Sequence, residues 1–401
     1  MRKIMLQQLK RIPFQLWVLG IADAFLNVSA SMIFTISGPF MKEVLKSSSV
    51  AIGILEGVVE LVSWSLRLIS GIISDYFKNR KGVMVLGYFI IILSRPLLAL
   101  STGTWSTLGG RSLDRIGKGI QAAPRDAFVA DISPSGSRGT YFGLRHSLGM
   151  VGSIIGSFAV FCFIKMTECN YRLIFWLSFI PALLAFLFLI STVQEKKKPE
   201  TPNLKVSLNL KEILVLGKEY WIIILISVFF MLCRSSEIFI TLRALELGMA
   251  IKVVPFIMIT YHFAEIIISY PIGRLSDFIG RPLCIAIATI FLSGANFLIG
   301  NAKGNEAIFL GSLLWGMQRG IGNSVFLSWI ADKALPNLRA TAYGTFYLIS
   351  GLSLFLANLI TGIIANHEGY KTPYIGHALL GILPLMSLLL FIRKEKMKKK
   401  N

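Results

Sequence analysis

Long apolar stretches alternate with short polar segments along the whole chain. Twelve such stretches occur, at 14–41, 50–75, 82–101, 104–131, 138–165, 171–192, 219–246, 252–277, 282–300, 305–333, 339–366 and 373–393. A mostly apolar run of roughly 18 residues or more can cross the hydrocarbon core of a bilayer as a helix. Every backbone amide in hydrocarbon needs an internal partner, which excludes open strands. The pattern therefore predicts an all-α membrane protein with twelve transmembrane helices.

The composition agrees with lipid as the main solvent. Only 15% of the 401 residues are charged and 54% are hydrophobic, whereas soluble domains carry about 25% charged residues. A net charge of +20 would suggest nucleic acid in a soluble protein. Here the topology accounts for it, so we expect no nucleic-acid partner.

The basic residues are distributed unequally between the two sides of the membrane. Of the 41 Lys and Arg, 25 fall in or beside one set of loops and 8 in the opposite set. The positive-inside rule places the richer side, which includes both termini, in the cytoplasm. Anionic lipid at the cytoplasmic leaflet also favours this arrangement. We expect a multi-pass protein of the cell inner (plasma) membrane whose first apolar run is retained and not cleaved.

The chain divides into two similar halves. A polar, basic stretch at 193–218 is predicted to be a cytoplasmic linker between bundles at 1–192 and 219–401. Asp131 and Asp332 lie in similar segments 201 positions apart, as do Lys118 and Arg319. Parallel repeats of this kind are typical of transporters whose substrate site lies between the halves, near the middle of the membrane.

Two loops carry a family signature. Gly71, Asp75, Arg80 and Lys81 follow the second span, and the matching segment Gly273–Arg281 follows the eighth. The pattern G-x-x-x-D followed by basic residues resembles that of the major facilitator superfamily. The second copy is close to the family pattern, whereas the first has Asn79 where glycine is usual. The resemblance covers the whole chain and implies two pseudo-symmetric six-helix bundles.

The resemblance also implies a gate. In the family the loop aspartate caps a neighbouring helix end, and the loop arginine pairs with acids when the cytoplasmic side is closed. An anion is favourable at a helix N-terminus. The predicted gate residues are therefore Asp75, Arg80, Asp277 and Arg281. The alternative is that these charges only set the topology.

The fourth span is the most polar. Its segment Arg115–Gly119 is similar to the family's R-x-x-Q-G motif, with Lys118 in place of Gln. Polar residues at steps of three and four place Arg111, Asp114 and Lys118 on one helical stripe. We expect Asp114 to pair with both. Charged groups inside a span are costly and usually face an aqueous cavity, although a purely structural ladder of ion pairs is the alternative.

Further polar residues lie in other spans. Arg234 and Glu237 in the seventh span form either a substrate clamp or a mutually neutralised pair, and Glu56, Glu60 and Arg67 in the second either line the cavity or lie at a solvated rim. The predicted substrate-binding residues are Asn27, Arg111, Asp114, Arg115, Lys118, Arg234, Glu237 and Arg319. The predicted proton-coupling acids are Asp23, Glu237 and Glu265, because buried carboxyls in functional sites often exchange protons.

Other classes of chemistry are not indicated. The glycines around Lys118 and the series Gly149, Gly152 and Gly156 lack the strand and spacing of a phosphate loop, and helix packing explains them better. We predict no enzymatic activity, cofactor or metal. The four cysteines are expected to be small buried hydrophobic residues, with a Cys162–Cys169 disulfide as the alternative.

These observations favour a secondary active transporter that works by alternating access. Away from their ends, the spans contain eight Arg or Lys against six Asp or Glu, which favours an anionic or zwitterionic substrate. We predict a monomer in the lipid bilayer that takes up a small metabolite by symport with protons. Ser157 stands where drug antiporters have Pro, which disfavours drug transport. Efflux of an amphipathic compound and a non-transporting receptor or scaffold are the competing hypotheses.

Overall fold

The computed structural model describes residues 13–77, 79–133, 138–193, 216–333 and 339–398. Most of the predicted linker, 194–215, lies outside these ranges, as do the side chains of Asp75 and Asp277. Within the described ranges every regular element is a helix.

Each predicted span falls on a helix or on a pair of consecutive helices. The first half contains α2 (Phe14–Pro39) with η1 (Phe40–Val44), α3 (Ser49–Phe77), α4 (Arg80–Ala99), α5 (Thr104–Ile132), α6 (Arg138–Met166), α7 (Tyr171–Leu177) and α8 (Phe179–Thr192). The second contains α10 (Lys218–Leu232), α11 (Ile238–Glu246), η2 (Ile251–Val253), α12 (Val254–Ile279), α13 (Arg281–Gly300), α14 (Asn305–Lys333), α15 (Arg339–Glu368), α16 (Lys371–Leu380) and α17 (Ile382–Lys398).

Nine segments of the described chain are long and apolar enough to cross a membrane by length and composition. The three other predicted spans are α5, α14 and the pair α10–α11. Helix α5 is long enough but too polar, because it contains Arg111, Asp114, Arg115 and Lys118. The pair α10–α11 falls short because the helix is interrupted, which leaves two short pieces.

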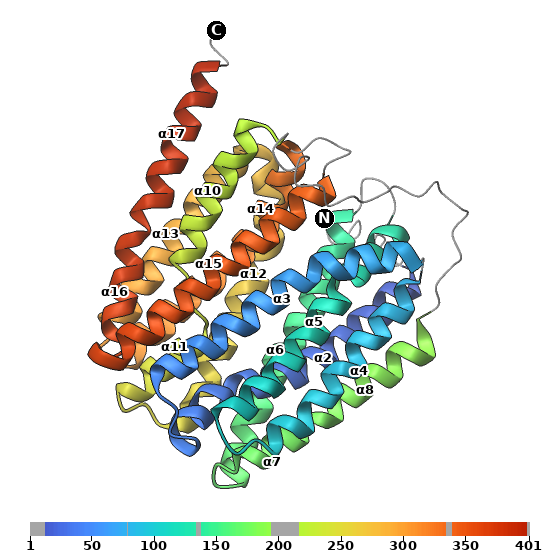
Figure 1. The fold of residues 1–401 in the computed structure, drawn as a ribbon, viewed down its shortest axis with the longest axis vertical. Coiled ribbons are helices and arrows are strands. Elements are labelled where there is room, and N and C mark those ends of the chain that lie inside the picture. The colour runs from blue at the N-terminus through green and yellow to red at the C-terminus, as the bar shows by residue number, and fades with distance from the viewer. Residues whose placement is uncertain (1–12, 78, 134–137, 194–215, 334–338, 399–401) are drawn as a thin grey trace, which may run out of the picture.

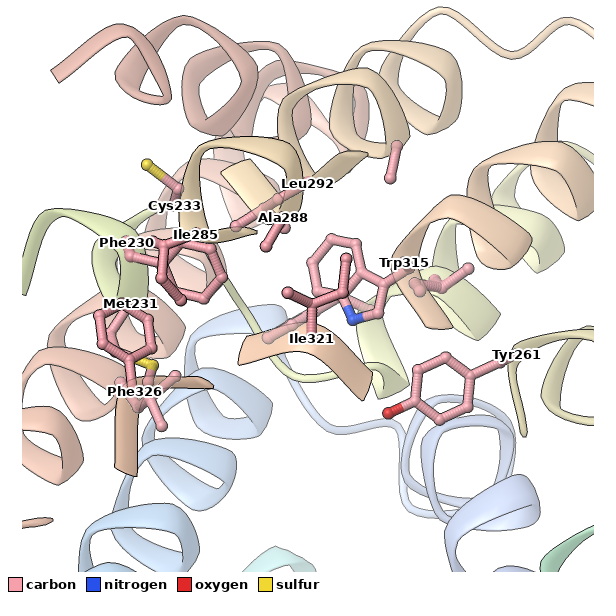
Figure 2. Packing of buried hydrophobic residues seen from close by; sticks show 14 of the residues in the cluster. Phe230, Met231, Cys233, Tyr261, Ile285, Ala288, Leu292, Trp315, Ile321 and Phe326 are labelled. Atoms are coloured by element: carbon pink, nitrogen blue, oxygen red, sulfur yellow. The ribbon is translucent and has the colours of Figure 1, made fainter. Parts of the chain in front are cut away.

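The helices form two bundles that lie side by side (Figure 1). The blue to green helices α2–α8 make one bundle, and the yellow to red helices make the other. Helix α3 packs along α15, α6 packs along α12, and α2 meets α11 across the interface. The core of the second bundle includes Phe230 and Phe326, whose rings meet edge to face at 5.3 Å (Figure 2).

Glycines allow the closest helix contacts. A Cβ at Gly152 or Gly156 of α6 would collide with the backbone of Ala24 or Val28 in α2. The backbones of Gly53 in α3 and Gly362 in α15 likewise approach each other across the two bundles. The glycine series in α6 therefore serves helix packing, as the sequence indicated.

The seventh predicted span is not continuous. The chain leaves the helix after Leu232 and re-enters it at Ile238. Two asparagine side chains satisfy the freed backbone groups: Asn296 donates to the Cys233 carbonyl at 2.9 Å, and Asn358 accepts from the Ser236 amide at 2.6 Å. Such interruptions inside a membrane protein persist only where other groups satisfy the backbone, and they commonly mark binding sites.

The two signature loops enter the following helix with different backbone conformations. Gly280 joins α12 to α13 with φ of 88°, a conformation that favours glycine. Asn79 has φ of −131° and caps α4, since its side chain accepts from the Gly82 amide at 2.7 Å. The substitution of Asn for Gly thus changes the loop conformation and not the start of the helix. All four cysteines are free, so the Cys162–Cys169 disulfide is absent.

Candidate functional site

A cavity of about 260 Å³ lies between the two bundles, and we call it the central cavity. Helices α2, α3, α5 and α6 contribute one wall, and α12, α14 and the α10–α11 break contribute the other. Its lining includes Asp23, Asn27, Arg67, Arg115, Lys118, Arg125, Arg145, His146, Glu237, Tyr261, His262, Glu265 and Arg319. The sequence predicted seven of these as site residues, namely Asp23, Asn27, Arg115, Lys118, Glu237, Glu265 and Arg319.

Asp23 is the centre of a network in the first bundle. Arg145 of α6 donates to it at 2.8 Å, the Tyr88 hydroxyl of α4 donates at 3.0 Å, and Arg125 of α5 lies 3.5 Å away. Arg125 and Arg145 also contact Asp126, at 3.2 and 3.3 Å. Asp23 thus joins three neighbouring helices and fixes two cavity arginines. Asn27 lies one turn further along and donates to the Asp23 carbonyl at 2.8 Å.

The polar stripe of α5 splits into buried pairs. Lys118 lies 2.8 Å from Asp114, as the spacing predicted. Arg111 does not pair with Asp114 as predicted, because it donates to Glu56 of α3 at 2.7 Å. Asp114 instead accepts from Arg95 of α4, also at 2.7 Å. The partners of this stripe come from neighbouring helices, which spacing within one helix cannot reveal.

Two predicted substrate-binding residues of this stripe do not line the central cavity. Arg111 and Asp114 are each 1% exposed and lie behind the wall. Arg115 does line the cavity and lies 3.4 Å from Glu60.

Glu56 occupies a position that neither sequence hypothesis described. It is fully buried, neither at a solvated rim nor in the lining of the central cavity. Besides Arg111 it accepts from the Ser236 hydroxyl of the second bundle at 2.7 Å. Glu56 therefore links α3 to the α10–α11 break across the interface.

The break between α10 and α11 places Glu237 at the cavity. Arg319 of α14 pairs with Glu237, and the Tyr261 hydroxyl of α12 donates to it at 3.2 Å. Arg234 lies 3.4 Å from the same carboxylate but is buried and does not line the cavity. The pair of Arg234 and Glu237 therefore forms, and only its acidic member lines the cavity.

Glu265 lies near two histidines, one of which, His146, belongs to the other bundle. Its Oε1 lies 3.7 Å from Nε2 of His146 in α6, and its Oε2 lies 3.7 Å from Nδ1 of His262, one turn away in α12. Glu265 is buried, with 3% of the residue exposed. His146 was not among the predicted site residues, although a histidine beside Arg145 inside an apolar span was the available signal.

The signature arginines make equivalent contacts in the two bundles. Arg80 pairs with Asp131 of α5, and Arg281 lies 3.3 Å from Asp332 of α14. Both acids follow the repeat of 201 positions. Among the described residues, no cluster of three or more His, Cys, Asp or Glu has the arrangement of a metal site.

Two helical bundles around a polar, largely buried central cavity are the architecture of a polytopic membrane transporter. The family model of the Major Facilitator Superfamily matches residues 20–249 and 235–401. An uncharacterised MFS-type transporter of Methanocaldococcus jannaschii is 30% identical over 389 residues, which cover 96% of each chain. The chain therefore belongs to the major facilitator superfamily and is a membrane transporter, not an enzyme.

Solved structures show the same fold. A mutant of the nucleoside transporter NupG superposes with a TM-score of 0.79 at 13% identity, covering 94% of this chain and 99% of that one. A bacterial homologue of the human lysosomal transporter Spinster, in an inward-facing and occupied conformation, gives 0.72 at 15% identity, with 94% and 96% covered. At these identities the likeness concerns the fold alone.

Proposed function

We propose that this transporter takes up a small anionic or zwitterionic metabolite together with protons, by alternating access around the central cavity. The observation that carries the proposal is the charge of the lining, which holds six Lys or Arg and three Asp or Glu. Acids behind the lining, Glu60, Asp114 and Asp126, pair with several of these cations and offset part of the surplus. The positive charge that is left attracts anions in a site of low dielectric. The three acids of the lining can bind an amino group, so a zwitterionic substrate is also compatible with the cavity.

The size and polarity of the cavity favour a small solute. The cavity is small, at about 260 Å³. Ligand pockets for drug-sized compounds are usually larger, about 300–1,000 Å³, and mostly apolar. Both features argue for a metabolite over an amphipathic drug.

The five predicted binding residues that line the cavity keep that role in the proposal: Asn27, Arg115, Lys118, Glu237 and Arg319. Arg111, Asp114 and Arg234 act behind the wall. Asp114 positions Lys118 at 2.8 Å, and Arg234 holds Glu237 at 3.4 Å.

Glu265 is the acid that we assign to proton coupling. The other two candidates, Asp23 and Glu237, contact guanidinium groups, which stay charged at any physiological pH. The partners of Glu265 are His146 and His262, and an imidazole, unlike a guanidinium group, can accept and release a proton. A proton taken up at this cluster alters the contact between α6 and α12, and hence between the bundles.

We place both termini in the cytoplasm, because the arginine- and lysine-rich loops lie on that side. The paired Arg80–Asp131 and Arg281–Asp332 contacts then lie at the cytoplasmic ends of the bundles. In the proposal these contacts, together with Asp75 and Asp277, set the balance between inward- and outward-facing states.

The proposal is tested by uptake into proteoliposomes. Radiolabelled succinate, glutamate, glycine and inorganic phosphate would be offered with and without an inward proton gradient, with glucose and a cationic dye as comparisons. We expect at least one anion or zwitterion to accumulate only with the gradient. Transport of the dye alone, or accumulation independent of the gradient, would contradict the proposal.

A further inference from the structure

Arg67 differs from the other cations of the central cavity. Each of the other five lies within 3.5 Å of a carboxylate or forms a direct ion pair with one, and these are Arg115, Lys118, Arg125, Arg145 and Arg319. Within the described chain, Arg67 has no carboxylate within salt-bridge distance, and its Nε is buried without a hydrogen-bond partner.

The neighbours of Arg67 explain why it has no partner. Glu60 lies on the same face of α3, but Trp64 Nε1 donates to one of its oxygens at 3.0 Å and Arg115 lies 3.4 Å from the other. Arg67 instead lies over the Trp64 ring, with its guanidinium carbon 5.0 Å from the ring centroid. The cation–π contact holds the group in place and leaves its donors free.

A half-buried guanidinium without a partner is costly unless water or an anion satisfies it. Water can do so while the cavity is empty. The planar donor fork of arginine matches a carboxylate or a phosphate with two parallel hydrogen bonds. An anion that enters the cavity can bind Arg67 without breaking an existing ion pair, which is not true of the five other cations.

We propose that Arg67, held by Trp64, is the anchor for the anionic group of the substrate, a carboxylate or a phosphate. This inference rests on the proposed transport of an anion or zwitterion and names where its charge binds. Trp64 also contacts Phe346 and Tyr347 of α15, at 6.1 and 5.7 Å between ring centroids. An anion bound at Arg67 therefore lies beside the interface of the two bundles, where it can influence their relative position.

Thermal unfolding of the purified full-length protein tests the anchor. Melting would be followed in chloride at constant ionic strength, with acetate, succinate or inorganic phosphate added, and glucose as the neutral comparison. The variants are Arg67→Gln, which removes the charge, and Arg67→Lys, which keeps it without the planar fork. Arg172→Gln is the control, because Arg172 contacts the Ser101 carbonyl at 3.3 Å, outside the central cavity.

We expect at least one anion to raise the melting temperature of the wild type and of Arg172→Gln. In Arg67→Gln the apparent affinity should fall by at least about tenfold, since a charge-assisted, bidentate contact is lost. Arg67→Lys should lie between them. In chloride alone, Arg67→Gln should melt only slightly below the wild type, because it loses the cation–π contact with Trp64 but breaks no ion pair.

The two ways to fail are distinct. If an anion stabilises the wild type and Arg67→Gln equally, the anchor is elsewhere and the proposed function stands. If no anion stabilises the wild type, whether or not glucose does, the anionic substrate class itself is wrong, and the assignment of Arg67 is overturned with it.

Discussion

Nε2 of His146 in the first bundle lies 3.7 Å from the buried carboxylate of Glu265 in the second. His262 approaches the same carboxylate from its other oxygen. Charged groups in the walls around this cluster are Arg125, Asp126 and Arg145 on one side, and Glu237 and Arg319 on the other. A change of protonation here alters a contact that exists only while α6 and α12 are in their present positions.

Replacing Glu265 with Gln should uncouple transport from protons. The amide keeps the shape of the side chain but cannot take up a proton. We expect loss of accumulation driven by a proton gradient, while exchange of labelled for unlabelled substrate across the membrane continues. The measurement is uptake and counterflow in the same proteoliposomes. Glu306→Gln, at an exposed position at the start of α14, is the control, and an equal effect in both would remove Glu265 from the mechanism.

The Glu56 contact should act as a latch between the bundles. Ser236→Ala removes the hydrogen bond between the bundles, which is worth about 1.5–3 kcal/mol because its acceptor is charged, and leaves the Glu56–Arg111 pair intact. We expect the Ser236→Ala variant to fold, and its central cavity to be open to solvent more often on the side of the membrane opposite the termini. Glu56→Gln, in contrast, leaves the buried charge of Arg111 without its carboxylate partner and should destabilise the protein by about 3–5 kcal/mol. Melting temperatures that fall equally in both variants would contradict this separation.

The Arg281–Asp332 contact should affect transport more than stability. Asp332 is half exposed, with 52% of its side chain accessible, and exposed ion pairs contribute about 0.2–1 kcal/mol. A double-mutant cycle of Arg281→Ala and Asp332→Ala should therefore give a coupling energy in this range. We expect the transport rate to change severalfold in each variant. A coupling energy of several kcal/mol with unchanged transport would indicate a purely structural pair.

The contact between α2 and α6 should be sensitive to a single methyl group. Gly152→Ala places a Cβ against the Ala24 backbone, and overpacking of this kind costs about 1–3 kcal/mol. Gly109→Ala in α5 is the matched control, because nothing lies within 4 Å of that site. It should be neutral or stabilising by up to about 1 kcal/mol. Unfolding in detergent micelles compares the two variants, and equal melting temperatures would contradict the packing argument.

Features set by local sequence were predictable. Apolar runs long enough to cross a bilayer predicted the helices. The spacing within α5 predicted the Lys118–Asp114 pair. The repeat correctly aligned Asp131 with Asp332, and both acids pair with the signature arginines.

Features that depend on packing between distant helices were not predictable. Arg111 pairs with Glu56, and Asp114 with Arg95, because three helices meet at that point. The interruption between α10 and α11 depends on Asn296 and Asn358, which lie in other helices. Arg67 could be recognised as an anion anchor only after every neighbouring carboxylate had been assigned to another partner.

Access to the central cavity from both sides of the membrane is the most direct test of the whole account. Ala30→Cys, in the lining of the cavity, would be made in a variant without the four native cysteines and treated with a membrane-impermeant thiol reagent in vesicles of either orientation. Ile155→Cys, on a surface that is 53% exposed in α6, is the lipid-facing control. We expect Ala30→Cys to react from both sides, with rates that substrate changes in opposite directions, and the control to stay unreacted. Reaction from one side only under every condition, or from neither, would contradict alternating access.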